Sequence, residues 1–600
     1  MAKQISVVPS IPGVRGAIVG VGAALVLVAV PAYGAPTRPL RPQLHTDRYG
    51  RVLEDVCPES SPGQRRCYAQ RVVGTGGSRA SRGAPLVGPS IIRPASGSTA
   101  SDPNCQSSGG GGGGFTPPAG SMTPTDVVAA YNIPQSSSAK GKIVALIELP
   151  STNALADVNA YRQAFNIPQL AQCPTDAKGV PTPNGTPCFA RVGEDGTVNS
   201  VGTDDCPGWS GETGLDMDMV SAACPDCSIV LVEATTSADL PQMNQIAASV
   251  LKPAAVSNSW GGAENGPGQD DQSPFNNPTT LTFVASGDSG YMDEDDNNGQ
   301  IAGSDFPSSS PYVVAVGGTT LMGGGGAYAE VVWNDDAQQQ GAGAGGSGCS
   351  GEFGMPTYQS GSGFSFGSCA MRASVDLAAA AEFNPSGGGG GGGGQGGGIA
   401  AYDADDQGWN PVVGTSAACP LVAAIMTRVG LAGKDNHELF YKHIDAFHDV
   451  TDGTNDNDGL CSDVMCNAGP GWDGPSGLGT PDATKLAALA AASSPAPADA
   501  GAGSKDAGGK GDADSPGAGQ DDAGASFEGT QGQGGGGGDN GSGWQGQAPA
   551  DQASIGTPST HPRSSGCAVS TVRSSGLGTL GWIGLGLAAY AWGLRKNRRG

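Results

Sequence analysis

Short apolar runs, each bounded by Gly, Pro or Asn, recur along the chain between residues 122 and 490. Near-continuous runs of Val, Ile and Leu are typical of strands that are buried on both faces, and helical patterns separate them here. The sequence therefore predicts an α/β domain over residues 122–490, in which a parallel sheet is flanked by helices. The predicted strands are KIVALIEL (142–149), CSIVLVEA (227–234), AAVSNSW (254–260), LTFVAS (281–286) and YVVAVGG (312–318).

Both ends of the chain carry longer apolar runs. Residues 1–34 place basic residues before the run AIVGVGAALVLVAV and end in small residues, which is the pattern of a signal peptide cleaved before Ala35. Residues 576–594 are mostly apolar and uncharged, and their length is about that needed to cross a ~30 Å hydrocarbon core. Basic residues follow, so we expect a transmembrane helix with a cytoplasmic tip. A buried helix is the alternative.

Gly566-Cys567, the apolar span and the Arg-rich tip together resemble the C-terminal sorting tail of myxobacterial surface proteins (MYXO-CTERM). The resemblance implies that residues 567–600 tether the protein to the membrane, either lastingly or until the chain is processed near Cys567. We therefore expect an exported protein that is extracellular or displayed on the cell surface.

Two stretches between these ends lack the pattern of a packed domain. Residues 35–121 are rich in Pro, Gly, Ser and Arg, and we expect a disordered, low-complexity leader or short propeptide that holds one disulfide. Residues 491–566 hold mainly Ala, Gly, Asp, Ser and Pro, which predicts a flexible acidic linker.

Composition narrows the possible partners. The 600 residues include 31 Lys and Arg against 56 Asp and Glu, a net charge of −25. This charge argues against binding to nucleic acid, which requires clustered basic side chains. The 14 Cys, behind an export signal, favour disulfides over zinc binding or cytosolic thiol chemistry. We expect a monomer whose contact with a membrane is made by its C-terminal helix.

A candidate nucleophile lies in VVGTSAACPLVAAIM (412–426). Ser416 stands between a Gly-Thr turn and an apolar helix, which puts its hydroxyl at the positive end of a helix dipole, beside unpaired backbone N–H groups. A serine that caps the helix is the alternative. The motif GTSxxxP also resembles the active-serine motif of subtilisin-like peptidases, whose triad requires a histidine upstream of the serine.

The histidines do not supply that group, because none lies between residues 46 and 436. His45 falls in the leader. His437, His443 and His448 lie in a predicted helix and its exit, and we interpret them as structural. Either Ser416 is not a nucleophile, or a different side chain takes its proton.

Two carboxyl groups offer that replacement. Glu212 and Asp216 stand four residues apart in DCPGWSGETGLDMDMVSAACP (205–225), beside an apolar stripe, so a helix brings them to one face. Two carboxyls this close share protons, which raises the pKa of one and suits a base supported by a second acid. A solvated acidic face is the alternative, although the flanking residues include no Lys or Arg partner.

A third carboxyl follows a predicted strand. Asp288 lies in SGDSG (286–290), directly after LTFVA, and catalytic groups collect at strand ends in α/β sheets. A carboxyl there stabilises an oxyanion only while protonated, because a carboxylate has no hydrogen to donate. Activity at acidic pH would follow. The alternative is an Asp in an ordinary turn.

Seven segments in one order resemble the sedolisin, or serine-carboxyl peptidase, family over residues 122–482. The resemblance implies a subtilisin-like fold and hydrolysis of protein or peptide substrates at acidic pH through an acyl-enzyme. Carried over residue by residue, it implies that Ser416 is the nucleophile, Glu212 the general base, Asp216 its partner and Asp288 the oxyanion-hole acid. The segments are TPTDVVAAYNIP (123–134), GETGLD (211–216), SNSWG (257–261), SGDSG (286–290), FPSSSPYVVAVGGT (306–319), RASVDLAAAAEFNP (372–385) and GTSAACP (414–420).

The same resemblance extends to a calcium site in FHDVTDGTND (447–456) and AGPGWDGPSGLGTP (468–481). Carboxylates and backbone carbonyls are oxygen donors that suit Ca²⁺, whereas two unconnected acidic turns are the alternative. The resemblance implies one Ca²⁺ bound by the side chains of Asp449 and Asp473 and by the carbonyls of Val450, Gly469 and Gly471.

The chain also departs from the family pattern. The family usually carries a large folded propeptide, whereas residues 35–121 are short of apolar content. Cys419, inside the serine motif, is unusual and fits a small packed residue.

Two functions from different classes remain after this comparison: an exported, calcium-stabilised endopeptidase active at acidic pH, and a noncatalytic calcium-binding adhesin or scaffold. A scaffold has no physical need for all four candidate residues, which favours the peptidase. An esterase of the α/β-hydrolase kind would require Gly-x-Ser-x-Gly, and the second Gly is missing after Ser416.

Overall fold

The computed structural model describes part of the chain, all of it inside the compact unit Met1–Ala500. The expected signal peptide (1–34) and the C-terminal tail (567–600) lie outside the described residues, as does the linker beyond residue 493. Within the described part, no helix is long and apolar enough to cross a membrane. The described residues are 44–57, 65–75, 105, 116–203, 205–291, 303–335, 343–385, 397–406, 408–433, 436–457, 459 and 461–493.

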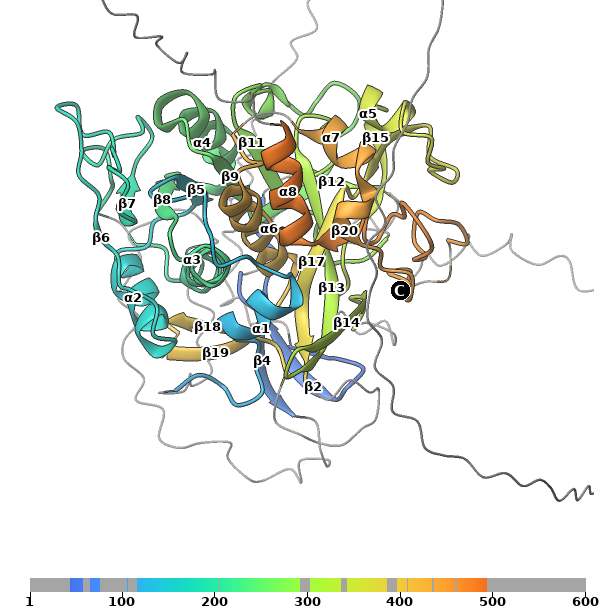
Figure 1. The fold of residues 1–600 in the computed structure, drawn as a ribbon, viewed down its shortest axis with the longest axis horizontal. Helices are drawn as coiled ribbons and strands as arrows, with labels where there is room; N and C mark the ends of the chain where they lie inside the picture. The colour runs from blue at the N-terminus through green and yellow to red at the C-terminus, as the bar shows by residue number, and fades with distance from the viewer. Residues whose placement is uncertain are drawn as a thin grey trace, which may run out of the picture. The chain divides into compact units, whose positions relative to one another are not determined.

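A nine-stranded sheet forms the centre of the described fold (Figure 1). Its strands, in spatial order, are β14 (Ala327–Val332), β13 (Val314–Gly324), β11 (Leu281–Ala285), β9 (Ala255–Asn258), β5 (Ile143–Glu148), β8 (Ser228–Glu233), β7 (Cys188–Val192) and β6 (Ala171–Gln172), and β17 (Leu377–Asn384) also pairs with β13.

Every strand predicted from an apolar run forms, and the α/β fold with a parallel sheet is confirmed. All neighbouring pairs in this sheet are parallel except β13 and β14. All six residues of β5 and all six of β8 are buried, which is why these runs are apolar without alternation.

Helices and smaller sheets surround this centre. The helices are α1 (Pro124–Ala130), α2 (Ala154–Ala164), α3 (Ser210–Ala223), α4 (Leu240–Ile246), α5 (Thr357–Ser360), α6 (Thr415–Val429), α7 (His437–Lys442) and α8 (Ala483–Ser493). The other strands are β1 (Leu44–Thr46), β2 (Arg51–Asp55), β3 (Arg66–Cys67), β4 (Gln70–Thr75), β10 (Trp260–Ala263), β12 (Asp305–Phe306), β15 (Gly348–Gly354), β16 (Met371–Ser374), β18 (Ile399–Asp403), β19 (Gly408–Val413), β20 (Phe447–His448) and β21 (Thr480–Pro481).

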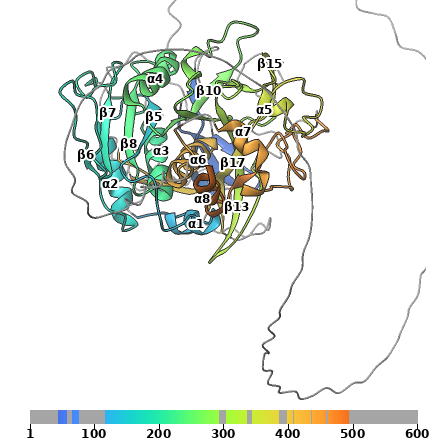
Figure 2. The same ribbon diagram turned by 45° about the horizontal axis from the view of Figure 1, so that its top comes forward.

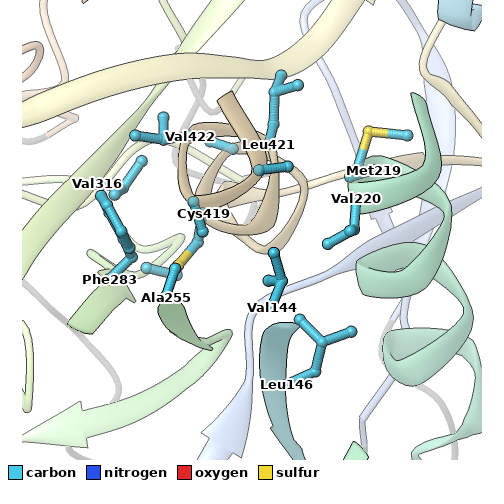
Figure 3. Packing of buried hydrophobic residues seen from close by; sticks show 14 of the residues in the cluster. Val144, Leu146, Met219, Val220, Ala255, Phe283, Val316, Cys419, Leu421 and Val422 are labelled. Carbon is cyan, nitrogen blue, oxygen red and sulfur yellow. The ribbon is translucent and has the colours of Figure 1, made fainter. Parts of the chain in front are cut away.

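Helix α6 packs on the central sheet and against α3, and Figures 1 and 2 show it between α3 and β17. In Figure 3, Cys419 of α6 lies among Ala255, Phe283 and Val316 from three strands, while Leu421 lies toward α3. All fifteen residues of α6 are buried. Cys419 is thus the small packed residue that the sequence suggested, and burial raises the pKa of its thiol.

The expectation of a disordered leader is wrong for residues 44–57 and 65–75, which form β1 to β4. β4 pairs with β2 on one side and with β19 of the domain on the other, and β3 pairs antiparallel with β10. These strands lack a core of their own, and they fold because the domain supplies strand edges for their backbone hydrogen bonds.

Buried ion pairs attach the leader to the domain. The guanidinium of Arg51 forms ion pairs with Asp335 at 3.0 Å and with Glu382, both of which belong to the domain. Arg71 forms an ion pair with Asp406 in the same way. Removing one partner of such a pair leaves an uncompensated buried charge, so these contacts specify where the leader lies.

Disulfides add covalent connections. The expected leader disulfide is Cys57–Cys67, and a second bridge joins Cys105 of the leader to Cys206 of the domain. Cys419 is the free cysteine among the described residues. The remaining bridges are Cys173–Cys188, Cys224–Cys227, Cys349–Cys369 and Cys461–Cys466.

Candidate active site

Ser416 lies in the first turn of α6, where the sequence placed it. Gly414 precedes the helix with a φ of 143°, a conformation that favours glycine. Ser416 is completely buried, and its hydroxyl donates a hydrogen bond of 3.3 Å to the carbonyl of Ser259. Its backbone N–H, at the positive end of the helix, donates to the carbonyl of Tyr68 at 3.1 Å.

Glu212 and Asp216 lie one turn apart on α3, and both are completely buried. The alternative of a solvated acidic face is therefore wrong. Burial raises the pKa of Glu212 well above its usual value, the charge of Glu148 raises it further, and the nearby Ser416 hydroxyl offsets part of the shift. Neither Glu212 oxygen has a hydrogen bond of normal geometry to any described residue.

Asp216 lies between Glu212 and a serine. Ser259 Oγ donates to the two carboxyl oxygens of Asp216 at 2.8 and 2.9 Å, and this hydroxyl is completely enclosed by protein. Burial raises the pKa of Asp216 well above its usual value, and the charges of Glu148 and Glu212 raise it further. Asp216 is therefore suited to hold a proton beside Glu212.

Glu148, the last residue of β5, is a member of this cluster that the sequence analysis missed. Its Oε2 accepts a hydrogen bond of 2.7 Å from Trp209 Nε1, and its carboxyl also interacts with that of Asp216. Burial raises the pKa of Glu148 to about 7. The sequence signal that could have identified Glu148 was its position at the carboxyl end of a predicted central strand, because functional groups gather there in parallel sheets. Three buried carboxyls thus share protons behind Ser416.

Asp288 follows β11 and lies at the start of α6. Its Oδ1 accepts hydrogen bonds from Thr415 N at 2.8 Å and from Thr415 Oγ1 at 2.7 Å. Burial raises the pKa of Asp288 to about 7, and the two bonds from Thr415 partly oppose the shift. Its Oδ2 is buried without a hydrogen-bond partner among the described residues and lies next to Gly414, two residues before Ser416, so a protonated Asp288 has a hydrogen to donate near this turn.

The described histidines make contacts elsewhere. His45 lies 3.2 Å from Asp55 within the leader, and His437 contacts the carbonyl of Val313 at 2.8 Å while its ring stacks on Tyr358. The contacts of His437 agree with the structural role that the sequence suggested for it.

The five residues expected to bind calcium lie close together in the structure. Gly469 N donates to Asp473 Oδ2 at 3.0 Å, and Gly471 N donates to Asp449 Oδ2 at 3.1 Å. Burial raises the pKa of Asp473 to about 7, and the charge of Asp449 contributes to the shift. The carbonyl of Val450 lies in the same cluster, 3.5 Å from Ser476 Oγ, which also donates to Asp473.

The carboxylates of Asp449 and Asp473 and the carbonyl of Val450 are oxygen donors that suit a hard cation. A bound cation would offset the burial of Asp473 and its repulsion by Asp449, so the residues fit the ion. Among the described residues, no three His, Cys, Asp or Glu side chains gather closely enough to hold a metal by themselves. Backbone carbonyls would therefore supply most of the ligands.

Comparison with known proteins gives this geometry a family context. Residues 207–435, which include Glu212, Asp288 and Ser416, match the model of the Subtilase family. Kumamolisin of Bacillus sp. (strain MN-32) is 32% identical over 386 residues, which cover 61% of this chain and 62% of kumamolisin. Tripeptidyl-peptidase sed1 of Aspergillus fumigatus is 38% identical over 84 residues, 13% of each chain.

The chain thus spans less than two thirds of the length of the curated relatives it matches. Among solved structures, Pseudomonas sedolisin, described as a serine-carboxyl proteinase, is 23% identical, with a TM-score of 0.48 and coverage of 62% of this chain and 99% of that one. Part of the chain, residues 207–435, is thus similar to the Subtilase family, and a longer stretch of 386 residues is similar to kumamolisin.

Proposed function

We propose that the protein is a secreted or surface-tethered serine-type endopeptidase that hydrolyses peptide bonds at acidic pH. The observation that carries the proposal is the position of Ser416 against Glu212, at the point where α6 and α3 pack together, with Asp288 beside the same turn. The match of residues 207–435 to the Subtilase family and the similarity to tripeptidyl-peptidase sed1 support a peptidase.

In this mechanism, Ser416 Oγ attacks the carbonyl carbon of the substrate while Glu212 takes the hydroxyl proton. The carbon–nitrogen bond then breaks, Glu212 returns the proton to the leaving amine, and an acyl-enzyme remains on Ser416. Water, activated by Glu212, releases the acid product. Asp216 would support Glu212 by holding a proton, and Ser259 and Glu148 would position Asp216.

The negative oxygen that develops on the substrate carbon requires donors. The Ser416 backbone N–H provides one, and the Oδ2 of a protonated Asp288 would provide the other. Two opposite requirements set the lower and upper pH limits of activity. Glu212 must be ionised to accept a proton, whereas Asp288 must keep its own, and Asp288 loses that proton as the pH rises through about 7.

A noncatalytic scaffold is a weaker explanation of the same residues. Burying carboxyl groups costs free energy unless they are neutralised or hydrogen-bonded, and neither Glu212 oxygen has a hydrogen bond of normal geometry to any described residue. A scaffold gains no stability from a buried carboxyl without hydrogen bonds. A general base, by contrast, requires an oxygen lone pair that is not already engaged and that is directed at the nucleophile.

The proposal is tested by peptide hydrolysis from about pH 2.5 to 8, with the chain from Ala35 to Gly566 beside its Ser416→Ala variant and a mixed peptide library as substrate. We expect a maximum below about pH 6 and a loss of roughly 10⁴-fold or more in the variant. Cleavage positions in the library also separate internal cuts from removal of terminal tripeptides. A folded wild-type chain with no Ser416-dependent hydrolysis at any pH would favour the scaffold.

We further propose that one Ca²⁺ stabilises the domain through Asp449, Asp473 and the carbonyls of Val450, Gly469 and Gly471. A bound ion present at a hundred times its Kd adds about 3 kcal/mol to the free energy of unfolding. A chelator should therefore lower the Tm of the wild-type chain by several degrees, and Asp473→Asn should remove most of that response.

Asp452→Asn is the matched control for this prediction, because Asp452 lies in the same loop with an exposed side chain. Its chelator response should equal that of the wild type. Equal responses in all three proteins would argue against a calcium site at Asp473.

Export and display complete the proposal. The signal-like residues 1–34 would direct secretion, and residues 576–594 would tether the protein until it is processed near Cys567. Protein or peptide substrates outside the cell would be its partners, and the enzyme would act as a monomer.

A further inference from the structure

The carboxyl group of Asp288 is held through one of its two oxygens. Oδ1 accepts a hydrogen bond of 2.8 Å from Thr415 N and a second one of 2.7 Å from Thr415 Oγ1. Oδ2 is buried without a hydrogen-bond partner among the described residues. Thr415, the first residue of α6, therefore provides both hydrogen bonds that the described part of the chain gives to this carboxyl.

This asymmetry decides which oxygen carries the proton of the neutral acid. A protonated carboxyl has one carbonyl-type oxygen, which accepts hydrogen bonds well, and one O–H group, which donates. Oδ1 already accepts from two donors, so placing the proton on Oδ1 would weaken both of these bonds. The proton of neutral Asp288 therefore belongs on Oδ2.

Oδ2 lies on the side of the turn where the proposed oxyanion would form. A Cβ at Gly414 would lie 2.8 Å from Asp288 Oδ2, and it would also overlap the carbonyl oxygen that accepts a hydrogen bond from the backbone N–H of Ser416. Glycine at position 414, with its φ of 143°, thus keeps one space open beside both groups. The two proposed oxyanion donors therefore face the same space.

The main chain around Asp288 is fixed by other contacts. The carbonyl of Asp288 accepts a hydrogen bond from Ala344 N at 2.8 Å, and the carbonyl of Gly287 accepts one from Gly346 N at 2.7 Å. These bonds hold the backbone, but they leave the carboxyl free to turn about the Cβ–Cγ bond, whose torsional preference is broad. The hydrogen bonds from Thr415 are what limits this rotation.

The side chain of Thr415 has two branches with different contacts. Its Oγ1 lies 2.7 Å from Asp288 Oδ1 and 3.3 Å from the carbonyl of Gly287, and its one hydrogen favours the shorter contact. Its Cγ2 lies toward β13, where a Cβ at Gly318 would be 3.3 Å away. Because valine has nearly the same shape and no hydroxyl, Thr415→Val removes the polar contact and keeps the packing.

We propose that Thr415 is a positioning residue of the active site, which fixes the carboxyl of Asp288 so that the hydrogen on Oδ2 is directed at the oxyanion. The inference rests on the proposed peptidase function and adds to it the residue that orients the Asp288 donor. In this role Thr415 acts through Asp288 and makes no contact of its own with the reacting atoms of the substrate.

Thr415 also affects the pH at which Asp288 loses its proton. Both hydrogen bonds from Thr415 stabilise the carboxylate, so they lower the Asp288 pKa against the burial that raises it. The other charged groups that act on Asp288 are Arg66, Asp55 and Glu212, and all three are unchanged in Thr415→Val. Loss of the hydroxyl should therefore raise the Asp288 pKa, and the decline of activity at high pH should move upward.

The test measures kcat and KM for peptide hydrolysis by the full exported chain from about pH 4 to 9. We expect Thr415→Val to lower kcat roughly 10- to 100-fold and to leave KM within a few-fold, because the oxyanion develops only in the transition state. Its decline at high pH should lie above that of the wild type. Thr415→Ser keeps the hydroxyl and should recover most of the lost kcat together with the wild-type decline.

Thr427→Val is the matched control. Thr427 is buried on the same helix, and its Oγ1 donates to the carbonyl of Ala423 at 2.8 Å, so this variant also loses one buried hydroxyl hydrogen bond. Its kcat and its pH profile should stay close to those of the wild type.

A double-mutant cycle tests whether Thr415 acts through Asp288. In the Asp288→Ala background, Thr415→Val should change kcat by no more than about twofold, because the carboxyl that Thr415 positions is gone. If Thr415→Val does not fold, Thr415→Ala removes the hydroxyl without adding volume and takes its place in every comparison.

The outcomes separate this inference from the function on which it rests. An active wild type overturns the positioning role in three cases: Thr415→Val keeps the wild-type kcat, its kcat falls without an upward shift of the high-pH decline, or the losses of Thr415→Val and Asp288→Ala add. The peptidase stands in each of these cases. A folded wild type without Ser416-dependent hydrolysis overturns the peptidase itself, and the role of Thr415 with it.

Discussion

Replacing Glu212 by Gln is expected to lower kcat/KM by roughly 10²- to 10⁴-fold, because the amide keeps the shape of the side chain but cannot accept the proton of Ser416.

The same substitution should not prevent folding. Burial raises the pKa of Glu212, so the folded chain binds this proton more tightly than the unfolded chain does. The stability that this proton contributes is full below the unfolded pKa and is lost as the pH rises through the folded pKa. The amide of the Glu212→Gln variant does not titrate, so this loss does not occur. We therefore expect the Tm of the variant at neutral pH to equal or exceed that of the wild type.

Asp218→Asn is the matched control. Asp218 lies on the same helix and is equally buried, but its carboxyl accepts a hydrogen bond from Tyr402 N at 2.8 Å, in a different part of the structure. Its kcat/KM should stay within a few-fold of the wild type. Steady-state kinetics and thermal unfolding of the three proteins check the prediction, and a Glu212→Gln enzyme with near-normal kcat/KM would show that another group is the base.

The sequence predicted the elements whose signal is local. β5 and β8 are buried on both faces, so their side chains must be apolar throughout, and a run of such residues is visible without knowing any neighbour. The turn before Ser416 and the spacing of Glu212 and Asp216 are likewise visible in a short stretch of sequence. The sequence could therefore predict these three residues one by one, and the packing of α3 against α6 brings them into one candidate site.

The sequence analysis missed features that depend on contacts between residues far apart in the chain. Glu148 looks like the polar end of a strand, and its burial depends on Trp209 and α3 packing over it. The leader strands are short and carry charged residues, so nothing local distinguishes them from a disordered segment. Their order depends on β19 and on the ion pair between Arg51 and Glu382, partners more than three hundred positions away.

Asp288→Ala is expected to lower kcat/KM by about 10²- to 10³-fold, the usual cost of losing one oxyanion donor. Asp288→Asn separates this donor role from a structural one. The Oδ1 of the amide can still accept the two hydrogen bonds from Thr415. Its Nδ2 takes the place of Oδ2, which has no hydrogen-bond partner among the described residues, and donates at every pH.

The pH dependence gives the sharper test of Asp288. In the wild type, only the protonated carboxyl of Asp288 can donate a hydrogen bond to the oxyanion. Activity should therefore fall as the pH rises through the Asp288 pKa of about 7. An amide does not titrate in this range, so Asp288→Asn should keep a measurable fraction of the activity, and its decline above neutral pH should move upward or disappear. The measurement is kcat/KM against pH for the wild type, Asn and Ala variants. If the Asn variant declines at the same pH as the wild type, a different group sets that limit, because the hydrogen on Nδ2 cannot be lost there.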